Sequence, residues 1–133
     1  MHELFQRGAV GLLIICGALT AIFPDPVGLS AFSNAPRELL VHRQALVGLL
    51  GAGLILAAFV PVLRMPMVAA AVLSKGAWLL IAMAAPDLAP VLGAAALREV
   101  LQVAALAGAG AVFVFEARRE ARWNGLLPAR GEA

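Results

Sequence analysis

Apolar residues fill four long stretches of the chain, and short polar or proline-containing segments separate them. A helix of about 20 residues crosses the roughly 30 Å apolar core of a bilayer, and each stretch approaches or exceeds that length. Inside a bilayer every backbone polar group needs a partner within its own segment, which favours helices. The pattern predicts helices over residues 8–23, 36–63, 65–85 and 90–116. We therefore expect an all-α integral membrane four-helix bundle that forms a single domain over residues 1–133.

The ends of these stretches carry the usual helix-breaking signals. Prolines close the first and third stretches, because proline cannot continue a helix. A signal peptide is the competing interpretation of the first stretch, with Arg7 as its basic flank. Glu3 in that flank and a poor cleavage site around Ala21 favour a membrane helix instead. The polar segment 37–44 either begins the second helix or lies along the membrane interface, and residues 117–133 form a charged tail.

Composition supports membrane residence and excludes several classes of function. The chain is 62% hydrophobic and 14% charged, whereas soluble domains average about 45–50% and 25%. The net charge of +2 is small and forms no stripe that could track phosphates, so nucleic acid is not an expected partner. The single cysteine, Cys16, excludes an internal disulfide or a cysteine-pair redox motif. The pattern indicates no metal site and no cofactor.

The distribution of basic residues predicts an orientation. With four helices both termini lie on one side, together with six arginines: Arg7, Arg64, Arg118, Arg119, Arg122 and Arg130. The other side holds three: Arg37, Arg43 and Arg98. Because Lys and Arg concentrate in cytoplasmic loops, both termini are expected in the cytoplasm.

Lys75 is the most informative residue, since it lies near the middle of the third apolar stretch. An ionisable side chain at that depth is costly and marks a functional site by default. Counting about 1.5 Å per residue from the expected inner boundary places Lys75 roughly 14 Å deep and Glu99 roughly 25 Å deep. A direct contact between the two is left open at this point. Glu99 is the first candidate for a general acid or base, and Lys75 is the second.

Other polar residues form a gradient that descends from the outer face. Glu38 and His42, four residues apart, share a face of the second helix, and Glu99 and Gln102, three apart, share a face of the fourth. Arg98 lies beside them. If these faces converge, Glu38, His42, Arg98 and Gln102 line an outward-facing pocket that binds a small amphiphile. The alternative is a purely structural ion-pair cluster near the head groups.

The sequence also resembles a known family. A helix that ends at Phe23-Pro24, the segment with Glu38 before a Gly-rich second helix, Lys75, and the segment 97–101 around Glu99 resemble the DoxX-like group of four-helix bacterial membrane proteins. Those relatives more often carry arginine in the third helix. The resemblance implies a multi-pass protein of a bacterial-type inner (cell) membrane. Some members are linked to quinone-related oxidoreductases or occur as small subunits.

Three hypotheses for the function follow. The first is a bundle that binds, or processes by acid/base chemistry, a small hydrophobic molecule such as a quinone, a terpenoid or a lipid-like compound. The second is a non-catalytic accessory subunit of a larger membrane complex. The third is an oligomeric transporter of small molecules. Whether the chain is an enzyme is left open, and its expected partners are the lipid bilayer, a hydrophobic ligand, and another membrane protein or a second copy.

Overall fold

The computed structural model describes residues 1–22, 37–84 and 89–125. In this part the chain forms four helices, α1 (His2–Ile22), α2 (Arg37–Phe59), α3 (Pro61–Ala84) and α4 (Ala89–Trp123). The predicted all-helical architecture is thereby confirmed. The loop expected before the second helix and the turn expected at Pro86-Asp87 lie outside the described residues. The polar segment 37–44 belongs to α2 and not to a separate interfacial stretch.

The turn between α2 and α3 lies earlier than residue 64, where the predicted ranges 36–63 and 65–85 place it. Helix α2 ends at Phe59, and α3 begins at Pro61, where the missing N–H of proline costs nothing because first-turn donors have no partner in the helix. Pro66 lies inside α3. Arg64 donates from Nε to the Ala57 carbonyl (3.4 Å) and from Nη2 to the Ala58 carbonyl (3.1 Å). It therefore satisfies two carbonyls that the end of α2 leaves without helical partners.

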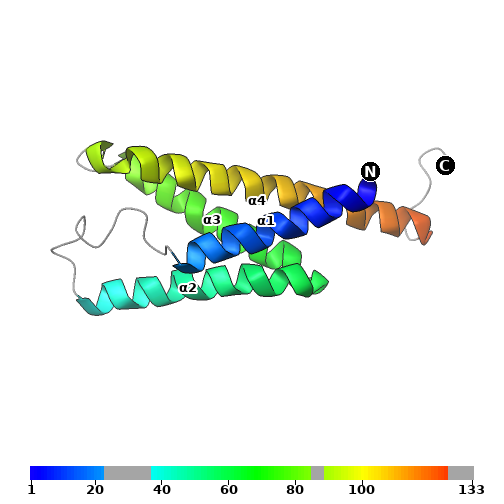
Figure 1. Cartoon of the computed structure of the whole chain (residues 1–133), viewed down its shortest axis with the longest axis horizontal. Helices are drawn as coiled ribbons and strands as arrows, with labels where there is room; N and C mark the ends of the chain where they lie inside the picture. Colours follow the sequence, from blue (N-terminus) through cyan, green and yellow to red (C-terminus); the bar gives the residue numbers. More distant parts are fainter. Residues whose placement is uncertain (23–36, 85–88, 126–133) are drawn as a thin grey trace.

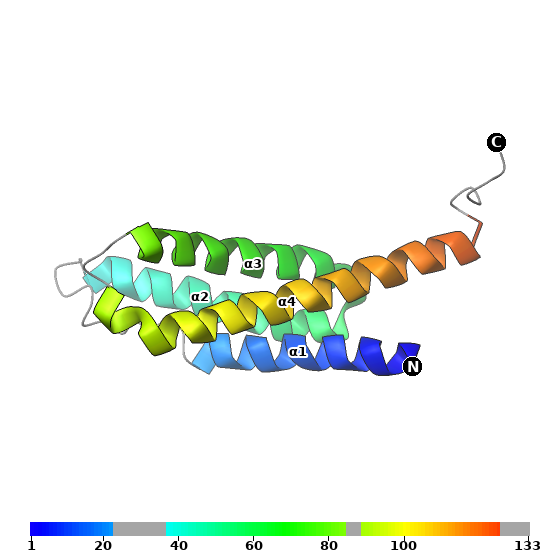
Figure 2. The same ribbon diagram turned by 90° about the horizontal axis from the view of Figure 1, so that it is seen from above.

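The first and last helices of the chain are longer than predicted. Helix α1 begins at His2 rather than residue 8, and α4 continues to Trp123 rather than ending at 116. At about 1.5 Å per residue, the 35 residues of α4 extend roughly 52 Å. Because α4 is longer than the other three helices, its last turns project beyond them (Figure 2). The charged residues after 116 continue the helix, which their good helix propensity permits.

The helices form a ring in which each packs against its neighbours along the chain, and α1 closes the ring against α4. The start of α1, the α2–α3 turn and the last turns of α4 lie at one end of the bundle (Figure 1). We call this the terminal end, and the opposite end, where α2 and α4 begin, the far end. Both ends of the described chain therefore share a side, as four antiparallel spans require.

Two glycines allow α1 and α2 to pack closely. A Cβ atom on Gly17 would lie 2.7 Å from the Gly51 carbonyl oxygen, and a Cβ on Gly51 would lie 2.7 Å from the Gly17 oxygen. The backbones touch at this crossing, which only small residues permit. Gly48, Gly51 and Gly53 form a glycine patch on α2. At Gly48, in the same patch, a Cβ would meet nothing within 4 Å.

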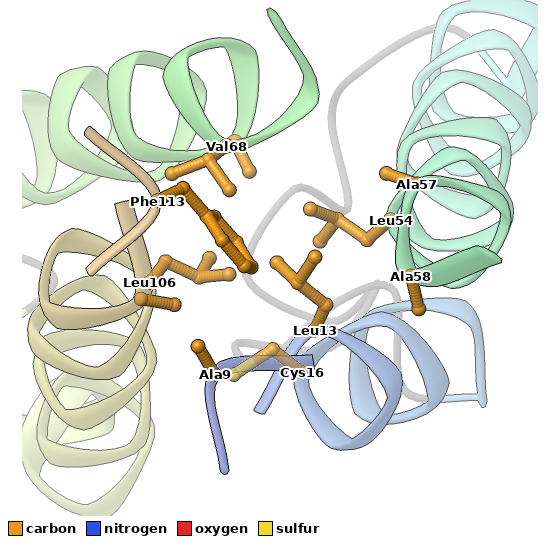
Figure 3. Packing of buried hydrophobic residues seen from close by; sticks show 11 residues of the cluster. Ala9, Leu13, Cys16, Leu54, Ala57, Ala58, Val68, Leu106 and Phe113 are labelled. Carbon is orange, nitrogen blue, oxygen red and sulfur yellow. The ribbon is translucent and has the colours of Figure 1, made fainter. Parts of the chain in front are cut away.

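The interior is divided into an apolar layer and a polar layer. The apolar layer lies toward the terminal end, where Leu13, Leu54 and Leu106 are fully buried. Side chains from all four helices meet there, with Phe113 and Val68 facing Leu54 and Leu13 (Figure 3). The polar layer lies next to it, toward the far end. Thr20, Lys75, Glu99 and Gln102 are its buried members.

The outside of the bundle is apolar. Large hydrophobic side chains are exposed on every helix, for example Ile15, Leu49, Leu73 and Leu101. All four helices are long and apolar enough to cross a membrane. Buried charges beneath an apolar exterior are the reverse of the arrangement in a water-soluble bundle, in which the polar residues face the solvent.

Candidate functional site: a buried polar layer

Lys75 and Glu99 form a direct ion pair between α3 and α4. The Lys75 Nζ donates to Glu99 Oε2 at 2.8 Å. Their side chains are 8% and 6% exposed. The two candidates for chemistry therefore meet, which the sequence had left open. Each charge compensates the other in a place where either one alone would be costly.

The estimate from the sequence separated these residues in depth because it used the wrong reference level. It set Glu116 level with Pro66, but the Arg64 guanidinium lies over the Phe113 ring, 5.2 Å from the ring centre. Lys75 is 11 residues from Arg64, and Glu99 is 14 residues from Phe113. The remaining difference of three residues is about 4.5 Å, which the two long side chains span.

Arg98 adds a second cation to the pair. Its Nη2 lies 3.8 Å from Glu99 Oε1, and its side chain is 32% exposed. Glu99 thus has one oxygen facing the buried ammonium and the other facing a partly exposed guanidinium. The sequence placed Arg98 beside the site, and the structure brings it there.

Gln102 extends the polar layer from α4 to α1. Its Oε1 lies 3.4 Å from Thr20 Oγ1, and the Thr20 hydroxyl also donates to the Cys16 carbonyl at 2.7 Å. A hydroxyl has one proton, and the shorter bond uses it. Turning the Gln102 amide so that its N–H faces Thr20 satisfies both groups, since the two amide orientations differ little in shape.

Thr20 is a member of the site that the sequence interpretation missed. It is 2% exposed and lies two residues before the end of α1. The signal was present, because Thr20 is the single hydroxyl-bearing residue in the apolar stretch 8–23. A lone threonine in an apolar helix often bonds only its own backbone, as Thr20 also does here. The contact with Gln102 follows from the packing of α1 against α4.

Glu38 and His42 lie toward the far end, in the first turns of α2, and both are exposed. No hydrogen bond or ion pair among the described residues joins either of them to Lys75, Glu99 or Gln102. Their role as ligand-binding residues therefore stays a prediction.

A second polar group lies at the terminal end, where the sequence indicated no site. His2 Nε2 lies 2.7 Å from Glu116 Oε1, which joins the first turn of α1 to α4. Glu116 is buried despite its charge. A surface hollow of about 330 Å³ opens beside this pair. Its lining comes from His2, Glu116, Arg119, Glu120, Trp123 and Asn124.

The polar layer has the parts needed for a proton exchange with a bound molecule. A carboxylate within hydrogen-bond reach of a ligand hydroxyl is positioned to act as a general base, and a nearby cation stabilises the negative charge that develops on the ligand. Glu99 supplies the carboxylate, and Lys75 and Arg98 supply the cations. An ammonium has three donors, so Lys75 is able to donate to Glu99 and to an oxygen of a bound molecule at the same time.

No family model, curated protein or solved structure matches the chain.

Proposed function

We propose that the chain is a four-span protein of a bacterial-type inner membrane that binds a small amphipathic molecule at its buried polar layer. Glu99 exchanges a proton with this molecule, and Lys75 stabilises the resulting negative charge. A quinone, a terpenoid or a lipid-like compound fits, because each has an apolar body and few polar atoms. The observation that carries the proposal is the Lys75–Glu99 pair, 2.8 Å long and buried among four apolar helices.

The arrangement of polar and apolar residues supports membrane insertion. Exposed leucines, isoleucines and phenylalanines cover the outside, while the charged pair is inside. Ionisable residues within membrane helices face the bundle interior and pair with one another, as these two do. Both termini are cytoplasmic in this proposal, because more arginines lie at the terminal end than at the far end.

The apolar layer supports an approach of the ligand from the far end. Leu13, Leu54 and Leu106 are fully buried between the polar layer and the terminal end. An apolar molecule from the bilayer or the outer leaflet therefore has a shorter way to Glu99 than one from the cytoplasm. The same layer disfavours the third hypothesis, since a polar transport path through one copy would have to cross it.

We also propose that the chain is related to the DoxX-like group that its sequence resembles. Two of the positions that carry it, Lys75 and Glu99, form the central pair of the polar layer. A link to quinone-related oxidoreductases would be consistent with a proton-exchanging carboxylate at this place.

The test is mass spectrometry of the chain extracted gently with its surrounding lipid. A retained quinone, terpenoid or similar amphiphile that Glu99→Gln loses would support the proposal. Leu101→Ala is the matched control, because Leu101 is on the same helix but exposed. A ligand-free wild-type chain, or equal retention by the wild type and Glu99→Gln, would contradict it.

Tryptophan fluorescence gives a second reading of the same site with decylubiquinone as the probe. Trp78 lies three residues after Lys75 and faces the same side of α3. In a Trp123→Phe variant it is the remaining tryptophan. Quinones quench tryptophan, so bound quinone should give saturable quenching that weakens strongly in Glu99→Gln. Trp78→Phe, which keeps only Trp123, controls for quinone dissolved in the lipid.

The second candidate is an accessory subunit of a larger membrane complex. Two pairs of small residues four positions apart lie on α4, Ala104 with Gly108 and Ala107 with Ala111, and all four residues are exposed. Small residues permit close packing of helices in a bilayer. In the mass spectrometry experiment, a stoichiometric partner protein without any ligand would favour this candidate over the first.

A further inference from the structure

We infer that the hollow at the terminal end binds the head group of a phospholipid with a primary amine, such as phosphatidylethanolamine. This inference rests on the membrane insertion proposed above, but it does not depend on the ligand of the polar layer. The hollow is lined by His2 in the first turn of α1 and by residues of the last turns of α4. These turns of α4 project beyond the other helices (Figure 2).

The charges that line the hollow select a zwitterion. Glu116 and Glu120 are the carboxylates and Arg119 is the guanidinium of the lining. A simple anion would face two carboxylates, and a simple cation would face Arg119. A head group with an ammonium and a phosphate satisfies both kinds of charge, the ammonium at the glutamates and the phosphate at Arg119.

Glu116 is held in place for this role. Its Oε1 lies 2.7 Å from His2 Nε2, and the side chain is buried, which restricts its movement. The second oxygen, Oε2, is the atom proposed to accept from the ammonium. A carboxylate that is oriented before binding loses less conformational freedom when the ligand arrives.

Size and position agree with a lipid head group. The volume of about 330 Å³ is at the lower end of the range of about 300–1,000 Å³ for small-molecule sites. Trp123 borders the hollow and is 89% exposed. Tryptophan concentrates at the level of lipid head groups, because its ring is apolar and its N–H is polar. The acyl chains would continue along the apolar outside of α1 and α4.

Phosphatidylcholine provides a close comparison. It has the same phosphate and the same charge, but its quaternary ammonium has no N–H to donate to Glu116 or Glu120. The loss of one or two charge-assisted hydrogen bonds at a partly exposed site predicts about fivefold weaker binding.

The experiment is native mass spectrometry of the delipidated full chain after incubation with an equimolar mixture of phosphatidylethanolamine, phosphatidylcholine and phosphatidylglycerol with identical acyl chains. The wild type should retain the ethanolamine lipid about fivefold over the choline lipid. Glu116→Gln and Glu120→Gln should each bring this ratio toward one, and Glu120 is exposed, so its variant keeps the fold. Arg119→Gln should weaken both lipids equally.

Glu3→Gln is the matched control, because it removes the same charge from the same end and Glu3 does not line the hollow. It should keep the wild-type ratio, and so should the double variant Lys75→Met/Glu99→Gln. Equal retention of the ethanolamine and choline lipids would overturn the inference. A preference for phosphatidylglycerol would do the same and would indicate a nonspecific contact with the basic end of α4.

Two further results separate the possible failures. If micromolar soluble phosphoethanolamine fills the hollow and no lipid is preferred, the ligand is a soluble zwitterion and the lipid assignment is wrong. If the chain does not float with liposomes, membrane insertion fails and both proposals fail with it. A chain that floats but shows no head-group preference overturns this inference alone.

Discussion

The Lys75–Glu99 pair dominates the chemistry of the interior at the scale of single residues. Breaking a buried ion pair leaves one charge uncompensated and costs about 3–5 kcal/mol, whereas replacing both partners with uncharged groups is often nearly neutral. We expect Glu99→Gln and Lys75→Met each to lower the free energy of unfolding. The double variant should be more stable than the sum of the two single effects predicts.

A double-mutant cycle of unfolding free energies in detergent measures this coupling. Lys75→Met should be the milder single change, because Arg98 still lies 3.8 Å from Oε1 of the remaining glutamate. Additive effects of the two substitutions would mean that the pair contributes nothing. If the double variant is stable, its ligand retention distinguishes two roles of the pair. Full retention would mean that the pair only stabilises the fold, and lost retention would support the proposed function.

Thr20 allows a smaller test in the same layer. Thr20→Val keeps the shape of the side chain but removes the hydroxyl that contacts Gln102. Because Gln102 is buried, losing its partner should cost about 1–3 kcal/mol. The variant Thr20→Val/Gln102→Leu should recover most of this cost. Thermal melting in detergent checks both results, and an unchanged melting temperature in Thr20→Val would show that water or another group replaces the hydroxyl.

Residue identity indicated part of this site but not its contacts. Lys75 and Glu99 stand out in the sequence because charge within an apolar stretch is expensive. Their contact depends on how far α3 and α4 are displaced along each other, which the contact between Arg64 and Phe113 reveals in the structure but not in the sequence. The role of Thr20 depends on the crossing of α1 and α4. The spacing of residues along a single helix predicts neither the displacement of α3 along α4 nor the crossing of α1 and α4.

The crossing of α1 and α2 is the most sensitive feature at the scale of helices. A methyl group on Gly17 would clash with the backbone of Gly51 and with Ile55, so Gly17→Ala must push the helices apart. Overpacking of this kind costs about 1–3 kcal/mol. Gly48→Ala is the control in α2, since its methyl group would meet no atom within 4 Å.

Unfolding free energies of the two alanine variants provide the measurement. We expect Gly48→Ala to be neutral or slightly stabilising, because alanine has a higher helix propensity than glycine. Equal stability of Gly17→Ala and Gly48→Ala would contradict the close contact between the backbones of α1 and α2.

Arg64 acts as a connector between helices, and not only as one of the arginines that set the orientation. It bonds the end of α2 and covers Phe113 of α4. Arg64→Lys keeps the charge but loses the planar fork that reaches two carbonyls and stacks on a ring. We expect a loss of about 1–2 kcal/mol of stability with an unchanged orientation. A stability equal to that of the wild type would mean that charge alone matters at position 64.

Hydropathy predicted the existence and order of the helices well, and their ends less well. The predicted ranges place a turn at residue 64, close to Pro66, because proline often breaks a helix. A proline near the start of a helix is tolerated, however, and α3 begins earlier, at Pro61. The charged residues after 116 suggested a tail, because hydropathy marks where a span leaves the apolar core and not where the helix ends. Helix propensity continues α4 beyond that point.

At the scale of the whole molecule, the layers of the interior separate the two proposed binding sites. From the terminal end to the far end, the interior passes from the His2–Glu116 pair through the apolar layer to the polar layer around Lys75 and Glu99. Each polar group is thus kept apart from the other by fully buried leucines. A head group at the terminal end and an amphiphile at the polar layer would therefore bind independently, which the unchanged lipid ratio of Lys75→Met/Glu99→Gln would reveal.

The orientation in the membrane is a property of the entire chain, and we expect both termini on the cytoplasmic side. In a Cys16→Ala background, single cysteines at Val62 and Asn124 lie at the terminal end, and one at Glu38 lies toward the far end; all three positions are exposed. In intact cells, a membrane-impermeant maleimide should label Glu38→Cys and spare the other two. Opened cells should label all three. Labelling of Val62→Cys and Asn124→Cys but not Glu38→Cys in intact cells would reverse the orientation, and labelling of Val62→Cys and Asn124→Cys from opposite sides would contradict a four-span arrangement.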